Sequence, residues 1–353
     1  MGVKGSQVQI LSARPFFFLL NRQPAADFFV YFAVLKFLIR SILVGAALLQ
    51  FASAQNREVL GEYKIAIIGR DQEDTIYQAA HLGAKDAALE MSKKYAIDVE
   101  LLIATPEASQ GGSQPTSLAE LFVDEADGFI ISPGASDVVA SSINFAMQQG
   151  QEVIFFESKL EEVEPMAAIL ADEKQAGRLA GKAILKRLPT QGRVAILTST
   201  SPTPQLKERL DGVRAALGYR RIEKVIPTEP NYHAAIKTIR EAEEADRNDH
   251  IKGWIFLEDW PLLGMPALPW KPGRLPVVAI QSSPSAFIYT DKGYLEALVV
   301  HPYYEWGYTG VVTMVEKLHN DKAPETSTIL TQPKVIDWRN LKDYREQWQT
   351  WFK

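Results

Sequence analysis

The chain has 353 residues, of which 46% are hydrophobic and 23% charged, a balance typical of a globular protein of one or two domains. It contains no cysteine, which excludes disulfides, thiol catalysis, thiolate metal sites and a lipidated N-terminal cysteine. Its net charge of −5 and the lack of any lysine- or arginine-rich block argue against binding to nucleic acid or to an anionic membrane surface.

Residues 35–54 have the pattern of a secretory signal peptide. Lys36 and Arg40 precede a short apolar run, and the segment ends in the A-x-A motif that closes at Ala54, after which we expect cleavage. The alternative is a transmembrane anchor over residues 28–51. That anchor would hold both basic side chains inside the bilayer, at a cost of about 2.5 to 3.5 kcal/mol each.

Residues 1–34 fit neither a signal peptide nor an anchor. The stretch "GSQVQILSARP" resembles a translation that runs out of a neighbouring tRNA gene, so we interpret residues 1–34 as an extension from a start codon assigned too far upstream. Removal of residues 1–54 takes away five of the 38 basic and one of the 43 acidic residues, which leaves a net charge of −9. An acidic, cysteine-free, secreted chain suits the periplasm.

From Lys64 onward, short apolar runs alternate with longer amphipathic ones. This pattern is typical of strands that are apolar along their whole length and separated by helices. It predicts parallel sheets that are covered on both faces. Ten strands exceed one ordinary open sheet, so we expect two α/β domains with their joint within residues 161–188. The predicted strands are 64–69, 99–104, 128–132, 152–157, 167–170, 193–199, 221–227, 253–259, 276–281 and 297–300. The predicted helices include 77–95, 136–149, 172–188, 205–217 and 232–246.

Two later segments fit this alternation less well. The proline-rich stretch 260–276 has no assigned role, and Trp260 within it suits either stacking on a ligand or packing inside a domain. The C-terminal end, "VIDWRNLKDYREQWQTWFK", carries three tryptophans. We expect this end to dock on a domain, because tryptophan side chains gain most when they are buried.

The turn after the first predicted strand, "GRDQEDTIY", carries Asp71, Glu73 and Asp74 where a dinucleotide site would need glycines. Asp74 precedes Thr75 and suits the N-cap of the following helix. The chain also lacks the phosphate-binding G-x-x-x-x-G-K-[ST] and the nucleophile motif G-x-S-x-G, and its five histidines lack metal-ligand spacing. We therefore expect no cofactor, no metal and no catalytic residues.

The order of later segments resembles a known family. The stretches "GFIISPGASDVVASSINFAMQQGQEVIFFES", "AAILADEKQAGRLAG" and "RVAILTSTSPTPQLKERLDGVRAAL" resemble the type I periplasmic solute-binding proteins of the ribose/galactose class, which serve sugar ABC transporters. The resemblance covers residues 64–330. It implies two doubly wound parallel-sheet lobes joined by a three-crossover hinge, with ligand held between them. The implied lobes are 62–169 plus 303–329 and 170–301 plus 334–353, with crossings near 169–172, 301–303 and 329–334.

Ligand-binding residues follow from the resemblance, position by position. Carboxylates and amides at such positions can fix the hydroxyl pairs of a sugar, and aromatic faces can cover its C–H surfaces. The two glutamates follow strands at whose carboxyl ends ligands bind in such sheets. The implied set is Asp74, Tyr77, Glu157, Ser158, Lys207, Tyr232, Glu258, Gln281 and His301.

Some of these positions depart from the family's pattern. Ile76 stands in place of an aromatic residue, Lys207 and Ser158 in place of arginines, and Gln281 in place of a carboxylate. The predicted cleft is therefore more acidic than a neutral-sugar site, and its ligand is expected to be a sugar, a polyol or an amino sugar. Three residues also have plainer interpretations, which are core packing for Tyr77, a surface charge for Lys207 and a hinge position for His301.

The resemblance implies a secreted, monomeric solute-binding protein that delivers its ligand to the permease of an ABC importer and is not an enzyme. A ligand-sensing receptor subunit of a membrane sensor kinase or chemoreceptor is the alternative. A DNA-binding regulator with this fold would need a helix-turn-helix where the apolar N-terminal segment lies. A hydrolase using Glu157 or Glu258 with His301 would turn over the bound sugar.

Overall fold

The computed structural model describes residues 59–107, 109, 112–123, 126–265 and 268–351. Residues from Val59 to the C-terminus form one compact unit. The predicted extension and signal peptide, residues 1–54, lie outside the described residues. Among the helices that the structure describes, none is both long and apolar enough to cross a membrane.

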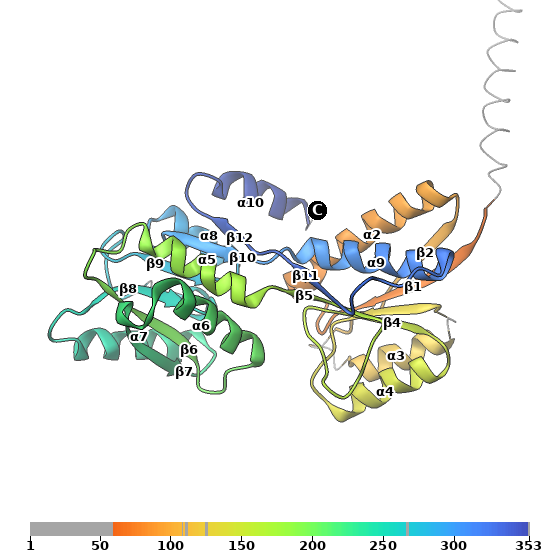
Figure 1. Ribbon diagram of the computed structural model, residues 1–353, viewed down its shortest axis with the longest axis horizontal. Coiled ribbons are helices and arrows are strands. Elements are labelled where there is room, and N and C mark those ends of the chain that lie inside the picture. The colour runs from red at the N-terminus through yellow and green to blue at the C-terminus, as the bar shows by residue number, and fades with distance from the viewer. Residues whose placement is uncertain (1–58, 108, 110–111, 124–125, 266–267, 352–353) are drawn as a thin grey trace, which may run out of the picture. The chain divides into compact units, whose positions relative to one another are not determined.

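The first lobe is built on a six-stranded parallel sheet with the strand order β11-β5-β4-β3-β1-β2. Helices α2 and α9 cover one face of this sheet, and α3 and α4 cover the other (Figure 1). Its strands are β1 (Glu62–Ile68), β2 (Asp98–Ile103), β3 (Gly128–Ile131), β4 (Glu152–Phe156), β5 (Ala167–Ala171) and β11 (Thr328–Thr331). Its helices are α2 (Thr75–Tyr95), α3 (Gln114–Val123), α4 (Asp137–Gln148) and α9 (Tyr303–Asn320).

The second lobe repeats this plan with the strand order β12-β10-β9-β8-β6-β7, in which β12 alone runs antiparallel to its neighbour β10. Its strands are β6 (Arg193–Ser199), β7 (Ile222–Thr228), β8 (Ile251–Phe256), β9 (Val277–Ile280), β10 (Ala297–Val300) and β12 (Lys334–Ile336). Its α-helices are α5 (Glu173–Leu185), α6 (Pro204–Leu217), α7 (Tyr232–Ala245), α8 (Pro284–Asp291) and α10 (Leu341–Thr350), with 3₁₀ turns η2 (Tyr219–Arg221) and η3 (Trp260–Leu262).

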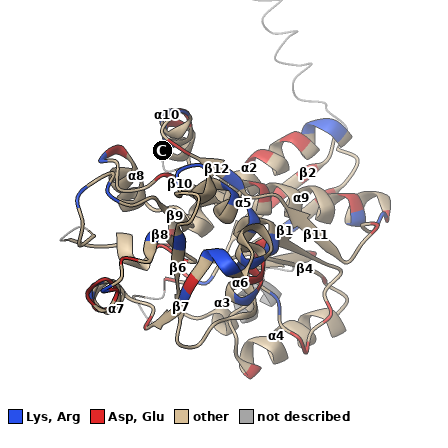
Figure 2. Cartoon of the chain, turned by 60° about the vertical axis from the view of Figure 1, so that its left-hand side comes forward, with Lys and Arg blue, Asp and Glu red and all other residues tan. Residues whose placement is uncertain are grey.

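The strands are apolar on both faces because helices cover both sides. In β1, Ile65 and Ile67 pack toward α2 and α9, whereas Ala66 and Ile68 pack toward α3 and α4. In the second lobe, Ile196 packs with α5 and α6 on the opposite face from its neighbours in the strand. Figure 2 shows the charged residues mainly on helices and connecting segments. The prediction of two covered parallel sheets is therefore confirmed.

The chain passes from one sheet to the other three times, between β5 and α5, between β10 and α9, and between β11 and β12. All ten predicted strands and all five named helices are present, with ends shifted by a few residues. The largest shift among the strands is in β8, which starts and ends earlier than predicted, so that Glu258 and Asp259 follow the strand instead of closing it. Strands β11 and β12 and helices α3, α8, α9 and α10 complete the two lobes.

The C-terminal end docks on the second lobe, as predicted. Helix α10 buries Tyr344 and Trp348, whose rings meet Phe287 of α8 edge to face, with ring centroids 5.8 and 5.3 Å apart. In the proline-rich segment the described residues form η3 and irregular backbone. Trp260 there is partly buried against the core, which agrees with the packing alternative. Trp270 stacks on Trp254 at 6.1 Å.

Candidate functional site

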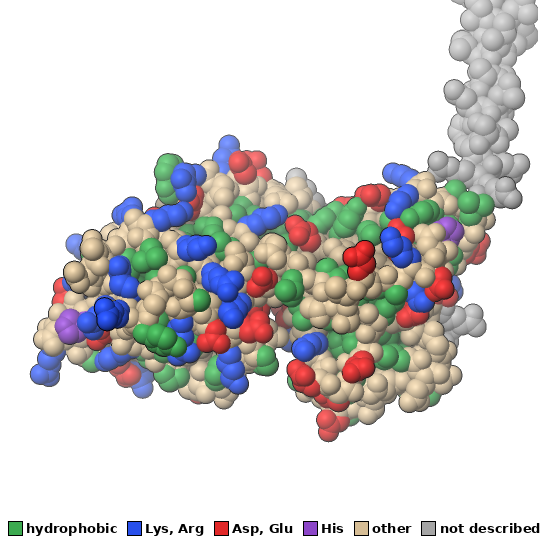
Figure 3. Space-filling view, in the orientation of Figure 1, with side chains coloured by type: hydrophobic (Ala, Val, Ile, Leu, Met, Phe, Trp, Pro, Cys, Tyr) green, Lys and Arg blue, Asp and Glu red, His purple; other side chains and the backbone are tan. Residues whose placement is uncertain are grey.

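A cavity of about 420 Å³ is lined by residues from both lobes. Its first-lobe wall includes the ends of β1, β3 and β4, and its second-lobe wall includes the start of α6 and the segments that follow β8, β9 and β10. The surface is hollowed between the two lobes, with acidic side chains on both sides (Figure 3). Because the carboxyl ends of parallel strands meet at one edge of each sheet, loops from several strands converge here.

The first-lobe wall is centred on Glu157, which directly follows β4. Its Oε1 accepts a hydrogen bond from Arg70 Nη2 at 2.5 Å, and its Oε2 accepts one from Ser132 Oγ at 2.5 Å. Arg70 also donates from Nε to the hydroxyl of Tyr77. Burial would lower the pKa of Arg70, but Glu157 and Tyr77 outweigh it and raise that pKa. The guanidinium is thus fixed at the cavity in its charged form.

The second-lobe wall is centred on Arg209, whose side chain is only 5% exposed. Its five N–H groups meet five acceptors, so no donor is left over. Nε and Nη2 form a bidentate pair with Glu173 at 2.6 and 2.9 Å. Nη1 donates to the Leu257 carbonyl at 2.8 Å and to Glu258 Oε1 at 2.6 Å, and Nη2 also donates to His301 Nε2 at 3.1 Å. Arg209 therefore orients its neighbours.

The neighbours of Arg209 have shifted pKa values. Burial lowers the pKa of His301 to about 4, with Arg209 adding to the effect, so the ring is neutral. Since a guanidinium can only donate, Nε2 accepts and the ring proton lies on Nδ1. Nδ1 has no partner within the part of the chain that the structure describes. Burial would raise the pKa of Glu173, but the guanidinium of Arg209, which bonds to both of its oxygens, holds it below the ordinary value.

Glu258 differs from Glu173, although both bond to Arg209. Burial raises the pKa of Glu258 to about 7, because Asp259 and Glu173 add to the desolvation and Arg209 only partly offsets them. The side chain of Glu258 is 18% exposed, and only its Oε1 is bonded within the described residues. Burial also raises the pKa of the adjacent Asp259. Oε2 of Glu258 is therefore open to a ligand in the cavity.

Two cavity residues have left-handed backbones. Glu157 after β4 has φ of 64°, and Gln281 after β9 has φ of 95°, although neither is glycine. The strands β4 and β9 occupy the same place in the two strand orders, so the two residues correspond between the lobes. Such conformations cost about 1 to 3 kcal/mol and concentrate at functional sites. Each wall of the cavity therefore presents one polar side chain, Glu157 or Gln281, from a strained turn.

Aromatic groups close the cavity near the second crossing. Trp306 on α9 donates from Nε1 to Thr331 Oγ1 at 2.9 Å and stacks on the His301 ring, with centroids 6.3 Å apart. Tyr303, at the start of α9, packs edge to face against Trp306. These aromatic rings can cover the apolar surface of a small ligand.

The structure brings five of the nine predicted site residues to this cavity, namely Glu157, Ser158, Glu258, Gln281 and His301. The other four lie apart from its lining for local reasons.

Asp74 is the N-cap of α2, where it accepts from the amide of Ile76 at 2.9 Å. Tyr77 is 2% exposed, and its hydroxyl accepts a hydrogen bond from Arg70 Nε. Lys207 is exposed on α6, and Tyr232 lies at another hollow beside Met265.

Sequence reasoning missed both guanidinium groups. The predicted set contains Lys207 and His301 as its basic residues, but Arg70 and Arg209 also line the cavity, whereas Lys207 does not. Arg70 comes from the turn after β1 and stands against Glu157. Arg209 comes from the helix face two residues beyond Lys207. Glu173 and Trp306 were also missed. Among the described residues, no group of three or more metal-binding side chains is placed to hold a metal ion.

Comparison with known proteins places the chain in a family. Residues 65–322 match the periplasmic binding protein domain. A search of the curated proteins finds no match.

Several solved structures share the fold. A periplasmic ribose ABC transporter structure from Conexibacter woesei DSM 14684 is 21% identical with a TM-score of 0.71, over 82% of this chain and 96% of that chain. AraP, an arabinose-binding protein from Geobacillus stearothermophilus, is 18% identical with a TM-score of 0.69, over 80% of this chain and 99% of that chain. An ABC transporter solute-binding protein from Burkholderia graminis C4D1M, in complex with D-arabinose, is 22% identical with a TM-score of 0.63, over 80% and 97%. A chain of the XylFII–LytSN complex has the same identity and TM-score, over 79% of this chain and 99% of that chain.

The family match covers most of the chain, and the two covered parallel sheets, three crossings and cavity lined from both lobes agree with it. The chain belongs to the periplasmic binding protein domain family, and its fold is that of the type I periplasmic binding proteins.

Proposed function

We propose that this protein is a secreted solute-binding protein that captures a sugar or sugar-like molecule between its two lobes and delivers it to an ABC importer. The observation that carries the proposal is the set of polar groups around one cavity that lack partners within the described residues. They include Oε2 of Glu258, Nδ1 of His301 and the side-chain amide of Gln281, besides the buried hydroxyl of Tyr303. A ligand rich in hydroxyls both donates and accepts, so it can satisfy such groups.

In the proposal, the ligand contacts Glu157, Ser158, Glu258, Gln281 and His301. Arg70 supplies the cationic contact that the sequence analysis assigned to Lys207. Aromatic cover comes from Trp306. The volume of about 420 Å³ suits a small polar ligand. Arg209 acts as a positioning residue, because all its donors are already used.

A thermal-shift screen of the purified protein against monosaccharides, disaccharides, amino sugars, polyols and sugar acids tests the proposal. At a thousand-fold excess over the dissociation constant, a ligand that binds only the folded state adds about 4 kcal/mol of stability. For a chain of this size that raises the melting temperature by several degrees. A shift within one chemical class supports solute binding. A flat screen of a folded protein without co-purified ligand contradicts it.

The second candidate is a ligand-sensing receptor subunit, which the similarity to a chain of the XylFII–LytSN complex favours. Both functions use the same ligand site and differ only in the membrane partner. Permease and ATPase genes beside the coding gene favour transport, and a histidine kinase gene favours sensing. Co-purification of the membrane partner with the liganded protein distinguishes the two directly.

A further inference from the structure

The cavity carries more negative than positive groups. Five glutamates line it, Glu157, Glu161, Glu173, Glu208 and Glu258, against the three cations Arg70, Lys159 and Arg209. Each of the three cations already has a carboxylate partner. The closest approaches are 2.5 Å from Arg70 to Glu157, 3.6 Å from Lys159 to Glu161 and 2.6 Å from Arg209 to both Glu173 and Glu258. No cation of the lining is left to neutralise Glu208 or the second partner of Arg209.

The imbalance is sharpest around Arg209. Its guanidinium is the single charged cation in a buried cluster that holds the three carboxyl groups of Glu173, Glu258 and Asp259. His301 adds no charge, because its Nε2 accepts from Arg209. A buried carboxylate without a counter-charge is costly, so such a cluster favours either protonation or an added cation. Glu258 is the member whose free oxygen faces the cavity.

The second-lobe wall also requires hydrogen-bond partners from the ligand, in addition to a positive charge. His301 is 2% exposed and its Nδ1 has no partner among the described residues, so it needs an acceptor. The Gln281 amide, also without a side-chain partner there, needs both an acceptor and a donor. A simple alkyl amine would leave these groups unsatisfied. Hydroxyl groups on the ligand would satisfy them.

We propose that the ligand is an amino sugar, a polyhydroxylated ring whose protonated amine binds Oε2 of Glu258 while its hydroxyls meet Gln281 and the Nδ1–H of His301. This inference rests on the proposed function and narrows its ligand to one chemical class. The ammonium supplies the cation that the cluster around Arg209 lacks. A sugar acid would add a further negative charge and is excluded from the cavity.

Calorimetric titration at pH 7 tests the inference with matched probes. They are D-glucosamine, D-galactosamine and D-mannosamine, each against its neutral parent sugar and its N-acetyl derivative, with D-galacturonate and putrescine as further probes. One amino sugar is expected to bind at least about tenfold more tightly than its parent, as a charge-assisted hydrogen bond provides. Galacturonate and putrescine are expected not to bind.

The variant Glu258→Gln keeps the shape and the accepting oxygen but removes the charge. It is expected to bring the amino sugar and its parent to about equal affinity. The control Glu164→Gln makes the same change at an exposed position outside the cavity lining and is expected to keep the preference. Because the comparison of probes on the unaltered protein stands by itself, it holds even if a variant folds poorly.

The outcomes separate the two proposals. A neutral sugar, an N-acetyl sugar or galacturonate that binds as tightly as the amino sugars overturns the amino-sugar inference and leaves solute binding in place. Equal binding of putrescine overturns the requirement for hydroxyls. Binding of none of these probes, with a flat result in the wider screen, overturns both proposals.

Discussion

Arg70 and Arg209 line the same cavity but depend differently on their carboxylate partners. The Arg209 side chain is 5% exposed and its partner Glu173 is 9% exposed, whereas Arg70 is 45% exposed and Glu157 is 20% exposed. An ion pair that water reaches contributes little to stability. Removing one partner of a buried pair leaves an uncompensated charge in the interior.

We therefore expect Arg209→Met to lower the free energy of unfolding by about 3 to 5 kcal/mol. Arg70→Met, the matched change at the exposed pair, should lower it by less than about 1 kcal/mol. Urea denaturation of both ligand-free variants measures the difference. Equal losses would contradict the assignment of Arg209 as the buried centre of the second-lobe wall.

Glu258 gives the stability a specific pH dependence. Its pKa is about 7 in the folded protein against an ordinary 4.5, so between these values the folded state holds a proton that the unfolded chain releases. The free energy of unfolding due to this group therefore falls as the pH rises from 4.5 to 7. Glu258→Gln cannot titrate. Its stability relative to the unaltered protein should increase by on the order of 3 kcal/mol across that window.

Two buried histidines change the free energy of unfolding in the opposite direction, over an overlapping pH range. Burial lowers the pKa of His301 and of His81 to about 4, so each adds stability as the pH rises from 4 to 6.5. Both remain in Glu258→Gln, so their contribution cancels in the difference between the two proteins. Urea denaturation at pH 5, 6, 7 and 8 measures that difference. A constant value would show that Glu258 titrates at its ordinary pKa.

The sequence allowed part of this site to be predicted. Glu157, Glu258 and Gln281 follow apolar strands, and the carboxyl ends of parallel strands mark the ligand edge. Arg70 lies in a polar turn with no periodic pattern. Arg209 lies in "LKERLDG", which reads like a solvated helix face. Its burial becomes apparent only when Glu173, 36 residues earlier, is known to be its partner.

At the scale of elements, paired glycines allow two helix pairs to touch backbone to backbone. In the second lobe, a Cβ at Gly177 of α5 would lie 1.9 Å from the carbonyl oxygen of Arg209 on α6. In the first lobe, a Cβ at Gly307 of α9 would lie 1.8 Å from the carbonyl oxygen of Ala80 on α2. Distances below 3.0 Å force the helices apart, so alanine is not tolerated there without a shift of backbone.

Gly177→Ala and Gly307→Ala are both expected to lower the free energy of unfolding by about 1 to 3 kcal/mol, as overpacking does. Only Gly177→Ala should also weaken ligand binding, because the displaced backbone belongs to Arg209. Thermal denaturation and calorimetric titration of the two variants measure both effects. Equal affinities would show that the position of α6 does not control the site.

The same scale shows why some elements escaped prediction. Strands β11 and β12 have four and three residues and begin with the exposed Thr328 and Lys334, so neither forms a long apolar run. Helix α9 begins with aromatic residues directly after Pro302, a composition that favours strands as much as helices. By contrast, the buried part of β1, residues 65–68, is apolar without interruption because helices cover both faces of its sheet.

For the whole molecule, the three crossings concentrate the connections between lobes close to the cavity. Glu173 follows the first crossing, His301 lies at the second, and Arg209 bonds to both while also holding Glu258. A ligand that binds Glu258 therefore acts on a side-chain network that reaches two of the three connections. Domain closure about such hinges is a common response to ligand.

Closure should bring α4 of the first lobe toward α6 of the second, because Pro133 and Ala135 before α4 line the cavity opposite Pro204 at the start of α6. The chain has no cysteine, so spin labels at Ser141→Cys on α4 and Asp211→Cys on α6, both exposed, are the only ones present. Pulsed electron resonance should show their separation shorten by more than about 2 Å when a stabilising sugar saturates the protein.

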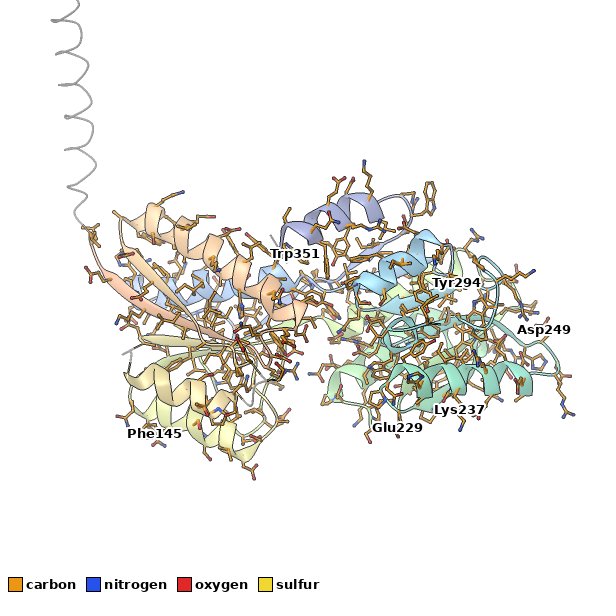
Figure 4. All side chains as sticks on the ribbon, turned by 180° about the vertical axis from the view of Figure 1, so that it is seen from behind. Phe145, Glu229, Lys237, Asp249, Tyr294 and Trp351 are labelled. Atoms are coloured by element: carbon orange, nitrogen blue, oxygen red, sulfur yellow. The ribbon has the colours of Figure 1, made fainter. Side chains whose placement is uncertain are left out.

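The control pair keeps both labels in one lobe, at Asp211→Cys and at Lys237→Cys, which is 76% exposed on α7 (Figure 4). Because the two helices belong to the same lobe, their separation should stay unchanged by the sugar. A shortened distance only in the pair that spans the lobes identifies a hinge motion. An unchanged distance in both pairs, with the sugar bound as judged by thermal shift, would mean that the cavity accepts its ligand without closure. The capture step would then rest on the side chains of the preformed site alone.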